Sequence, residues 1–168
     1  AELVGHVGAK SWNEPPPAYE PPDTGWTHTS NWIALELTEP AKLEIEVERQ
    51  EGVAFQGSTG MVTARNKLVP ALSLYKNWDN TSCEDHRYNN AGNTDWSTVE
   101  YVGNRKNAQG RDVVTYSVKL KEGQYSIAIG GSPKVLETYP AGDCDVTDPQ
   151  CYAYTGRHGF EASFKTIP

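Results

Sequence analysis

A strict alternation of apolar and acidic residues occupies one short segment of the chain, Leu43-Glu44-Ile45-Glu46-Val47-Glu48. Successive side chains of a β-strand point to opposite faces, so this period of two predicts a strand with one buried face and one wetted face. The segment 33–37 has the same period, and the sequence Thr-Glu-Pro-Ala at 38–41 predicts a turn after it. We therefore expect two strands joined by a turn.

The same pattern recurs along the rest of the chain. Further strands are expected at 69–75, 114–120, 125–129 and 160–164, and Glu122-Gly123 predicts the tip of a hairpin between two of them. The 15 Gly and 11 Pro residues interrupt the sequence too often for long helices. The predicted fold class is all-β, an antiparallel β-sandwich of jelly-roll type.

A length of 168 residues fits one domain, preceded here by an arm. Residues 1–24 are rich in proline and predict an extended N-terminal arm packed on the domain, although Leu3–Val7 also fits a short edge strand. Residues 25–168 are expected to form the single β-sandwich domain. Two long irregular stretches, 76–98 and 134–158, are the expected location of function, because long loops in compact domains usually carry it.

Charge and hydropathy exclude several classes of partner. With 15 basic and 22 acidic residues the formal net charge is −7, which opposes binding to nucleic acid. No apolar run approaches the roughly 20 residues that cross a bilayer, so no membrane span is expected. The chain begins at Ala1, as a secreted protein does after cleavage of its signal peptide, and we expect a secreted, periplasmic or cell-surface protein.

The usual catalytic signatures are missing from the sequence. It contains no His-Glu-x-x-His, no Gly-x-Ser-x-Gly, no phosphate-binding glycine loop and no Cys-x-x-Cys. A carboxylate pair acting on glycosides cannot be nominated among 22 acidic residues. We therefore expect a protein that is not an enzyme.

Trp26 and His28 lie two residues apart in Gly-Trp-Thr-His, so an extended segment would place both side chains on one side. His86 follows 58 residues after His28, inside the first long irregular stretch. The other two histidines, His6 and His158, are next to glycines, which suggests tight turns or exposed positions. Spacing alone favours a packed tryptophan and ordinary polar loop residues over a metal site.

A resemblance to a known family changes that balance. From Trp26 to about Ser132 the chain resembles secreted bacterial β-sandwich proteins related to the surface copper proteins MopE and CorA of methane oxidisers. The segments that carry the resemblance are Trp26–Trp32, Pro70–Tyr75, Trp78–Asn80, His86–Asn90 and Gly123–Gly131. In that family two histidines hold Cu(I), helped by a tryptophan, two residues before the first histidine, that is oxidised to kynurenine.

The resemblance implies a copper site at His28 and Trp26, with His86 as the candidate second histidine. Imidazole suits copper, and Cu(I) accepts few ligands, so two histidines and one weak third donor suffice. An intact indole offers no lone pair, whereas kynurenine has an aromatic amine and a ketone. The implied function is copper acquisition, storage or delivery, with a periplasmic or outer-membrane copper-handling protein as the expected partner.

Two further features of the loops are candidates for stabilising them. Oxygen donors at spacings that calcium tolerates crowd both irregular stretches: Asp79, Asn80, Glu84, Asp85, Asp143, Asp145 and Asp148. Solvated acidic loops are the simpler interpretation of both groups. Cys144 and Cys151 can close a short loop as a disulfide in an oxidising compartment, which leaves Cys83 over.

An alternative function uses the aromatic residues. Aromatic side chains make up 10% of the chain, and exposed Trp and Tyr on a β-sandwich stack on sugar rings in carbohydrate-binding modules. Such a module, with structural calcium, is the second hypothesis. The simpler interpretation is that these large side chains fill or cover the core.

Overall fold

The computed structural model describes residues 1–9, 30–78, 98–105, 110–132 and 156–167 of the chain. These residues form strands and no helix. The strands are β1 (Glu2–Gly8), β2 (Asn31–Leu37), β3 (Ala41–Arg49), β4 (Ala54–Gly57), β5 (Gly60–Thr63), β6 (Pro70–Lys76), β7 (Glu100–Arg105), β8 (Val113–Leu120), β9 (Gly123–Gly131) and β10 (Arg157–Ile167). No segment of the described part of the chain is a helix long and apolar enough to span a membrane.

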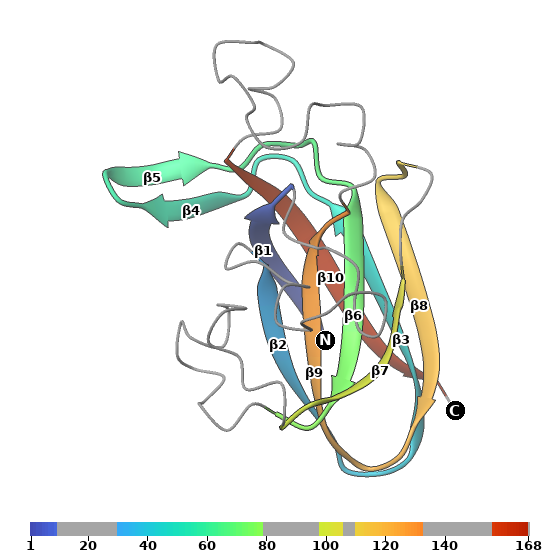
Figure 1. Cartoon of the computed structure of the whole chain (residues 1–168). Helices are drawn as coiled ribbons and strands as arrows, with labels where there is room; N and C mark the ends of the chain where they lie inside the picture. Colours follow the sequence, from blue (N-terminus) through green and yellow to red (C-terminus); the bar gives the residue numbers. More distant parts are fainter. Residues whose placement is uncertain (10–29, 79–97, 106–109, 133–155, 168) are drawn as a thin grey trace.

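Eight of the strands build two four-stranded antiparallel sheets that pack face to face (Figure 1). The strand order is β1-β10-β3-β8 in the first sheet and β2-β9-β6-β7 in the second, while β4 and β5 form a separate hairpin. Strands that follow one another in the sequence mostly lie in opposite sheets, which is the arrangement of a jelly roll. The predicted all-β, antiparallel sandwich is confirmed.

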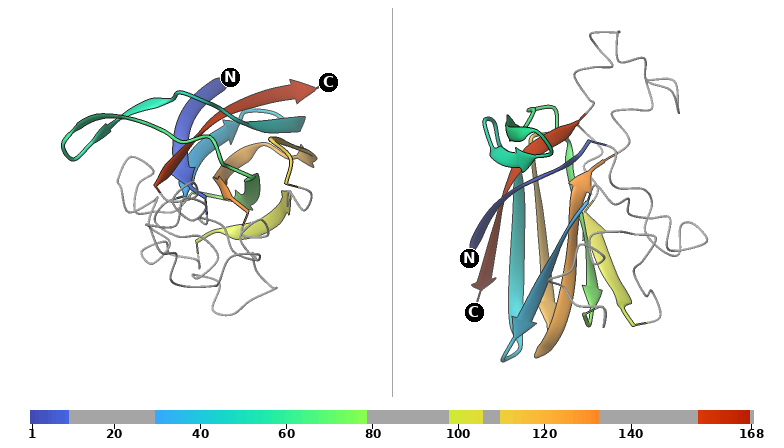
Figure 2. Two further views of the ribbon diagram at one scale, coloured as in Figure 1. Left: turned by 90° about the horizontal axis from the view of Figure 1, so that it is seen from above. Right: turned by 90° about the vertical axis from the view of Figure 1, so that its left-hand side faces the viewer.

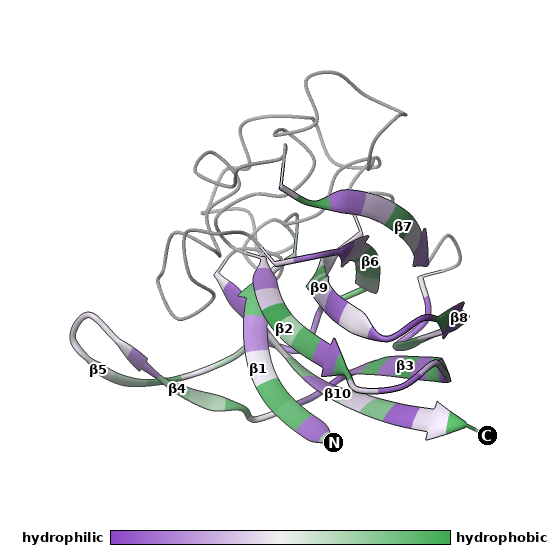
Figure 3. Ribbon diagram, turned by 90° about the horizontal axis from the view of Figure 1, so that it is seen from below, coloured by the Kyte–Doolittle hydropathy of each residue, from purple (hydrophilic) through white to green (hydrophobic). Residues whose placement is uncertain are grey.

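The core lies between the two sheets and follows from the alternation in β3. Leu43, Ile45 and Val47 are at most 1% exposed and pack against side chains of the other sheet. The glutamates between them point to the opposite face, and Figure 3 shows this alternation of apolar and polar residues along β3. Burial of each such side chain stabilises the fold by about 1.5–3 kcal/mol.

The prediction of a hairpin at Glu122-Gly123 is wrong. Residues 121–122 do join β8 to β9 closely, but β8 pairs with β3 and β9 pairs with β2 and β6, so the connection crosses from one sheet to the other. The turn after β2 crosses in the same way. An alternating pattern indicates that one face of a strand is buried. It does not indicate whether the next strand pairs with it in the same sheet or packs on it from the facing sheet.

Three strands were not expected from the sequence. The hairpin β4–β5 has only four residues in each strand, and β7 combines Gly103 and Asn104 with charged ends. Strands this short and polar lack a recognisable period. The N-terminal segment Leu3–Val7 matches the edge-strand alternative, since β1 is the outermost strand beside β10. Residues 10–24 of the predicted arm lie outside the described residues.

The first residue of the chain is part of the sheet. Ala1 and Phe164 exchange two backbone hydrogen bonds of 2.9 and 2.8 Å, in which the terminal amine donates to the carbonyl of Phe164 and the Phe164 N–H donates to the Ala1 carbonyl. The two ends of the chain therefore lie side by side at the edge of the first sheet, as both views of Figure 2 show.

Candidate functional site

The residues predicted from the sequence for the copper site, Trp26, His28 and His86, lie outside the described residues. The same is true of the acidic residues considered for calcium, of Cys83 and of the Cys144–Cys151 pair. These assignments stay predictions. The structure does describe Ser30, which follows the segment that contains Trp26 and His28, and Trp78, which precedes the segment that contains His86.

Ser30 is the first described residue after the Trp-x-His motif. It is fully buried, and its hydroxyl accepts a hydrogen bond of 3.1 Å from the indole N–H of Trp32. Asn31 then starts β2 opposite Ile129 of β9. The motif therefore ends two residues before a fixed, buried point at the start of β2.

Trp78 is the last described residue before the segment that contains His86. Its indole N–H is shared between the carbonyl oxygens of Leu35 and Tyr125, each at 3.1 Å. Asn77 before it adopts a left-handed backbone with φ of 70°, a conformation that asparagine tolerates better than most residues. These contacts fix the direction in which the chain leaves β6.

Ser30 and Trp78 are the two anchor points of the neighbouring segments, and they lie toward opposite ends of one sheet. Strands β2 and β6 both run antiparallel to β9, so they run parallel to each other. The start of β2 lies near Ile129, whereas Lys76 at the end of β6 pairs with Tyr125. Antiparallel strands rise about 3.4 Å per residue, so roughly 14 Å of sheet separates these two levels.

The outer face of this sheet, turned away from the first sheet, is also buried. Trp32, Ala71, Tyr75 and Ala128 form a second hydrophobic cluster on it, each at most 7% exposed. The ring of Tyr75 lies 5.4 Å from that of Trp32 in a stacked arrangement and 5.9 Å from that of Tyr101 in an edge contact. Most of β6 and β9 is thus buried on both faces of the sheet, although only one face contacts the first sheet.

Small polar side chains lie among these aromatic residues. Ser73 and Ser126 are fully buried; the Ser126 hydroxyl donates to the Asn77 carbonyl at 2.6 Å, whereas the Ser73 hydroxyl has no hydrogen-bond partner among the residues that the structure describes. Ser73 of β6 pairs with Ala128 of β9, and Ala128 pairs with Trp32 of β2. The Ser73 hydroxyl therefore lies in the same row of side chains across the three strands as Trp32. An unpartnered buried hydroxyl is destabilising, which makes this row unusual.

The donors needed for copper are not gathered on the described residues. No group of three or more His, Cys, Asp or Glu side chains that could hold a metal occurs within them. Serine hydroxyls are hard ligands that suit Cu(I) poorly.

The expectation for His6 and His158 is wrong, because both lie in strands. His158 is fully buried in β10, and its Nδ1 accepts a hydrogen bond of 3.0 Å from the Lys67 backbone N–H. Its neighbour Gly159 does not form a turn: a side chain there would collide with the backbone of Gln50 and with Val53. The glycine lets another segment pack closely on β10.

His6 lies on the opposite face of the same pair of strands. Val7 is in the core and pairs with His158, so His6 points away from the core, where its ring stacks on Phe55 at 3.9 Å. Burial, and secondly the positive charge of Arg157, lowers the pKa of His6. Because they face opposite ways, His6 and His158 do not form a shared site.

Four of the described aromatic residues are buried or held in place by the sheet. Trp32, Tyr75 and Tyr125 are at most 7% exposed, and the Trp78 indole is held by the two carbonyls. This supports the simpler interpretation that these aromatic residues fill the core or cover it. These four residues therefore offer no platform on which a sugar ring could stack.

The fold is similar to that of two solved copper proteins. CorA of Methylomicrobium album BG8, described as a surface-associated copper-binding protein important in copper acquisition, matches with a TM-score of 0.52 and 13% identity over 99% of this chain and 93% of its own. MopE of Methylococcus capsulatus, a secreted protein in which an oxidised tryptophan facilitates copper binding, matches with a TM-score of 0.51 and 15% identity over 99% of this chain and 84% of its own.

The pre-peptidase C-terminal domain of a Bacillus anthracis collagenase is also found, with a TM-score of 0.42 and 8% identity over 98% of this chain and 88% of its own. No protein-family model and no curated protein sequence matches the chain. At such identities the similarity to CorA and MopE establishes the shared fold.

Proposed function

We propose that the protein binds copper, holding Cu(I) through His28, His86 and residue 26. One observation carries the proposal: the Trp-x-His motif ends two residues before the buried start of β2, in a fold that resembles those of CorA and MopE. The proposed role is copper acquisition, storage or delivery without catalytic turnover.

Chain length supports a shared site for the two histidines. An extended chain spans at most about 3.3–3.6 Å per residue, so His28 lies within about 7 Å of Ser30. His86 is ten residues beyond Lys76, a reach of roughly 35 Å, which exceeds the roughly 14 Å along the strands and the roughly 10 Å across β9 that separate Lys76 from the start of β2. The described anchors therefore permit both imidazoles to meet beside the start of β2.

The chemistry of the three residues fits a cuprous ion. Two neutral imidazoles supply the nitrogen donors that copper favours. Residue 26 contributes a weak third contact, through the indole face if it is intact or through the aromatic amine and ketone if it is oxidised to kynurenine. We propose the oxidised form.

Copper proteins with this fold include a surface-associated and a secreted example, and we propose the same location for this chain. Copper is then the cargo, and a periplasmic or outer-membrane copper-handling protein is the proposed recipient. The negative charge of the chain, −7, favours attraction of a cation over long distances.

Metal analysis of the purified protein tests the proposal. The native chain is purified without chelator, loaded with Cu(I) and compared with His28→Ala, His86→Ala and the double variant. His6→Ala is the matched control, because the His6 side chain points away from the core and its ring stacks on Phe55. We expect about one copper per chain in the native protein and the control, and at least tenfold weaker binding in either site variant.

Retention of full copper affinity by both site variants would overturn the assignment. Peptide mass spectrometry of the segment that contains Trp26 tests the third contact separately. An unmodified Trp26 removes the kynurenine donor and leaves the two histidines as the ligands.

A further inference from the structure

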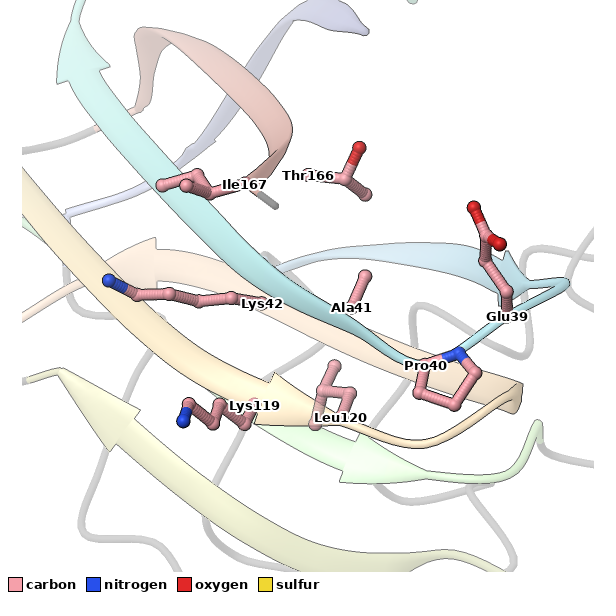
Figure 4. Close-up of a pocket in the computed structure, with 8 residues that line it drawn as sticks. All are labelled: Glu39, Pro40, Ala41, Lys42, Lys119, Leu120, Thr166 and Ile167. Carbon is pink, nitrogen blue, oxygen red and sulfur yellow. The ribbon is translucent and has the colours of Figure 1, made fainter.

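A hollow of about 530 Å³ lies at the end of the first sheet, beside the turn before β3 (Figure 4). Lys42 and Lys119 form a directly opposed pair on its outer face, whereas Leu120 belongs to the core cluster. The charged and apolar groups around the hollow therefore do not converge on one ligand. The side chains on the outer face of the second sheet do converge, and they are mostly aromatic.

Three aromatic rings on that face, those of Trp32, Tyr75 and Tyr101, form a continuous line of contacts, here called the aromatic path. Trp32 of β2 stacks on Tyr75 of β6 with 5.4 Å between the centroids, and Tyr75 meets Tyr101 of β7 edge-on at 5.9 Å. Both distances lie within the range of aromatic rings in contact, about 4.5–7 Å. Between β2 and β6, strand β9 presents the small side chains of Ser126 and Ala128, which lets the rings meet over it.

The two ends of the aromatic path differ in their access to water. Trp32 and Tyr75 are buried, whereas Tyr101 is partly exposed on β7, the edge strand of the sheet. The Tyr101 hydroxyl oxygen accepts a hydrogen bond of 2.6 Å from the side-chain amide of Asn104. A phenol at a partly exposed sheet edge can release its proton to water when it is oxidised, and a buried indole cannot do so directly.

The chemistry of these side chains gives the aromatic path a direction. Indole and phenol each lose a single electron to a strong oxidant, and a tyrosine that releases its proton is oxidised more easily than a tryptophan. Electron transfer is fast between aromatic rings in contact, because tunnelling weakens steeply with distance. We infer that the aromatic path carries single electrons from Tyr101 through Tyr75 to an oxidised Trp32.

The electrons and protons of this transfer balance. Hydroxyl radical takes one electron from Trp32 and becomes hydroxide, which leaves an indole radical cation. One electron from Tyr101 restores the indole, the Tyr101 hydroxyl proton goes to water, and a neutral tyrosyl radical remains at the sheet edge. A soluble reductant such as ascorbate then donates a hydrogen atom to that radical and restores the phenol.

The position of Trp32 gives the aromatic path its role. The Trp32 indole donates a hydrogen bond to Ser30, the first described residue after the Trp-x-His motif. Cu(I) reduces hydrogen peroxide to hydroxide and hydroxyl radical, and is itself oxidised to Cu(II). In this role, which rests on the proposed function, the aromatic path moves oxidising equivalents away from the start of β2 to the sheet edge.

Photo-oxidation of the full chain without copper tests the transfer itself. Ultraviolet light absorbed by tryptophan, with hexaamminecobalt(III) as the electron acceptor, produces indole radicals, and transient absorption follows their conversion to tyrosyl radical. We expect a first-order conversion whose rate does not depend on protein concentration. Trp32→Phe and Tyr101→Phe should each lose this phase. A nitroso spin trap with peptide mapping should find at least tenfold less adduct on Tyr101 in Trp32→Phe than in the native chain.

Tyr125→Phe is the matched control, because Tyr125 is a buried tyrosine of β9 in the core cluster, on the opposite face of the sheet. Its rate and its Tyr101 adduct should equal those of the native chain. Tyr75→Leu removes the ring that touches both ends, and we expect conversion at least tenfold slower once thermal unfolding shows that the variant is folded. Trp32→Phe and Tyr101→Phe test the path even if Tyr75→Leu does not fold.

An unchanged fast phase in Trp32→Phe or in Tyr101→Phe overturns the inference, and so does an equal loss in Tyr125→Phe. Native rates in folded Tyr75→Leu overturn the passage through Tyr75. Because the experiment contains no copper, its failure is distinct from failure of the copper proposal, which the metal analysis of His28→Ala and His86→Ala decides.

Discussion

The indole N–H of Trp78 lies 3.1 Å from the carbonyl oxygen of Leu35, which precedes it by 43 residues. This hydrogen bond, shared with Tyr125, joins the end of β6 to β2 across β9 and sets the point from which the His86 segment departs. The Trp-x-His motif enters the same β2 from its other end. One sheet therefore holds the residue that follows the Trp-x-His segment and the residue that precedes the His86 segment of the proposed copper site.

Replacement of Trp78 by phenylalanine removes that donor while keeping an aromatic ring. We expect a loss of about 1–2 kcal/mol in the free energy of unfolding, since two carbonyl oxygens lose a partner and some apolar surface is lost. Urea titration measures it. We also expect weaker copper binding at temperatures where the variant is fully folded. Unchanged copper affinity there would show that Trp78 does not position the His86 segment.

Ser73 and Ser126 offer a matched pair of substitutions on the buried outer face of that sheet. Ser126→Ala deletes the donor to the Asn77 carbonyl and is expected to destabilise the fold by about 1 kcal/mol. Ser73→Ala removes a hydroxyl that has no partner in the described part of the chain, and it is expected to be neutral or stabilising by up to about 1 kcal/mol. The midpoint of urea unfolding distinguishes them. Equal destabilisation would mean that the Ser73 hydroxyl has a partner in solution.

Two glycines of the second sheet, Gly131 in β9 and Gly103 in the edge strand β7, are predicted to differ in tolerance of a side chain. A side chain at Gly131 would collide with the backbone of Ala9, whereas one at Gly103 would meet the terminal hydroxyl of Tyr116, which can rotate away. We expect Gly131→Ala to cost about 3 kcal/mol and Gly103→Ala about 1 kcal/mol, at the two ends of the usual range for overpacking. Thermal unfolding measures both. The reverse order would show that the Ala9 segment moves more easily than Tyr116.

The strands could be predicted because the pattern that identifies each of them is local. Their pairing could not be predicted, because it depends on contacts between distant segments. The period of two in β3 identifies a strand with one buried face. It does not determine that the turn at 38–40 and residues 121–122 carry the chain between sheets, since this depends on contacts with distant strands such as β10. The nearly continuous burial of β6 corresponds to the apolar run at 69–75, which is typical of a strand covered on both faces.

The histidines show the same limit at the level of single residues. The alternation of Phe160 and Ala162, extended back by two positions, places His158 on the core face, so the sequence did contain that signal. Adjacent glycines suggested a turn, but Gly159 makes room for Gln50, a residue more than a hundred positions away. The copper assignment rests on the Trp-x-His resemblance, because no described residue supplies its donors.

The stack of His6 on Phe55 predicts a pH dependence of stability. Burial, and then Arg157, lowers the pKa of His6 below its ordinary value in the folded chain. The unfolded chain therefore takes up this proton first as the pH falls, so the contribution of neutral His6 is present above about pH 6.5 and is lost as the pH falls toward the folded pKa. Stability between pH 7.5 and pH 5 should decrease more in the native protein than in His6→Gln, which does not titrate. Arg157→Gln should give an intermediate slope, because it removes the secondary cause and leaves burial. Urea titrations at each pH measure the three slopes, and equal slopes for the native chain and His6→Gln would show that His6 is solvated in both states.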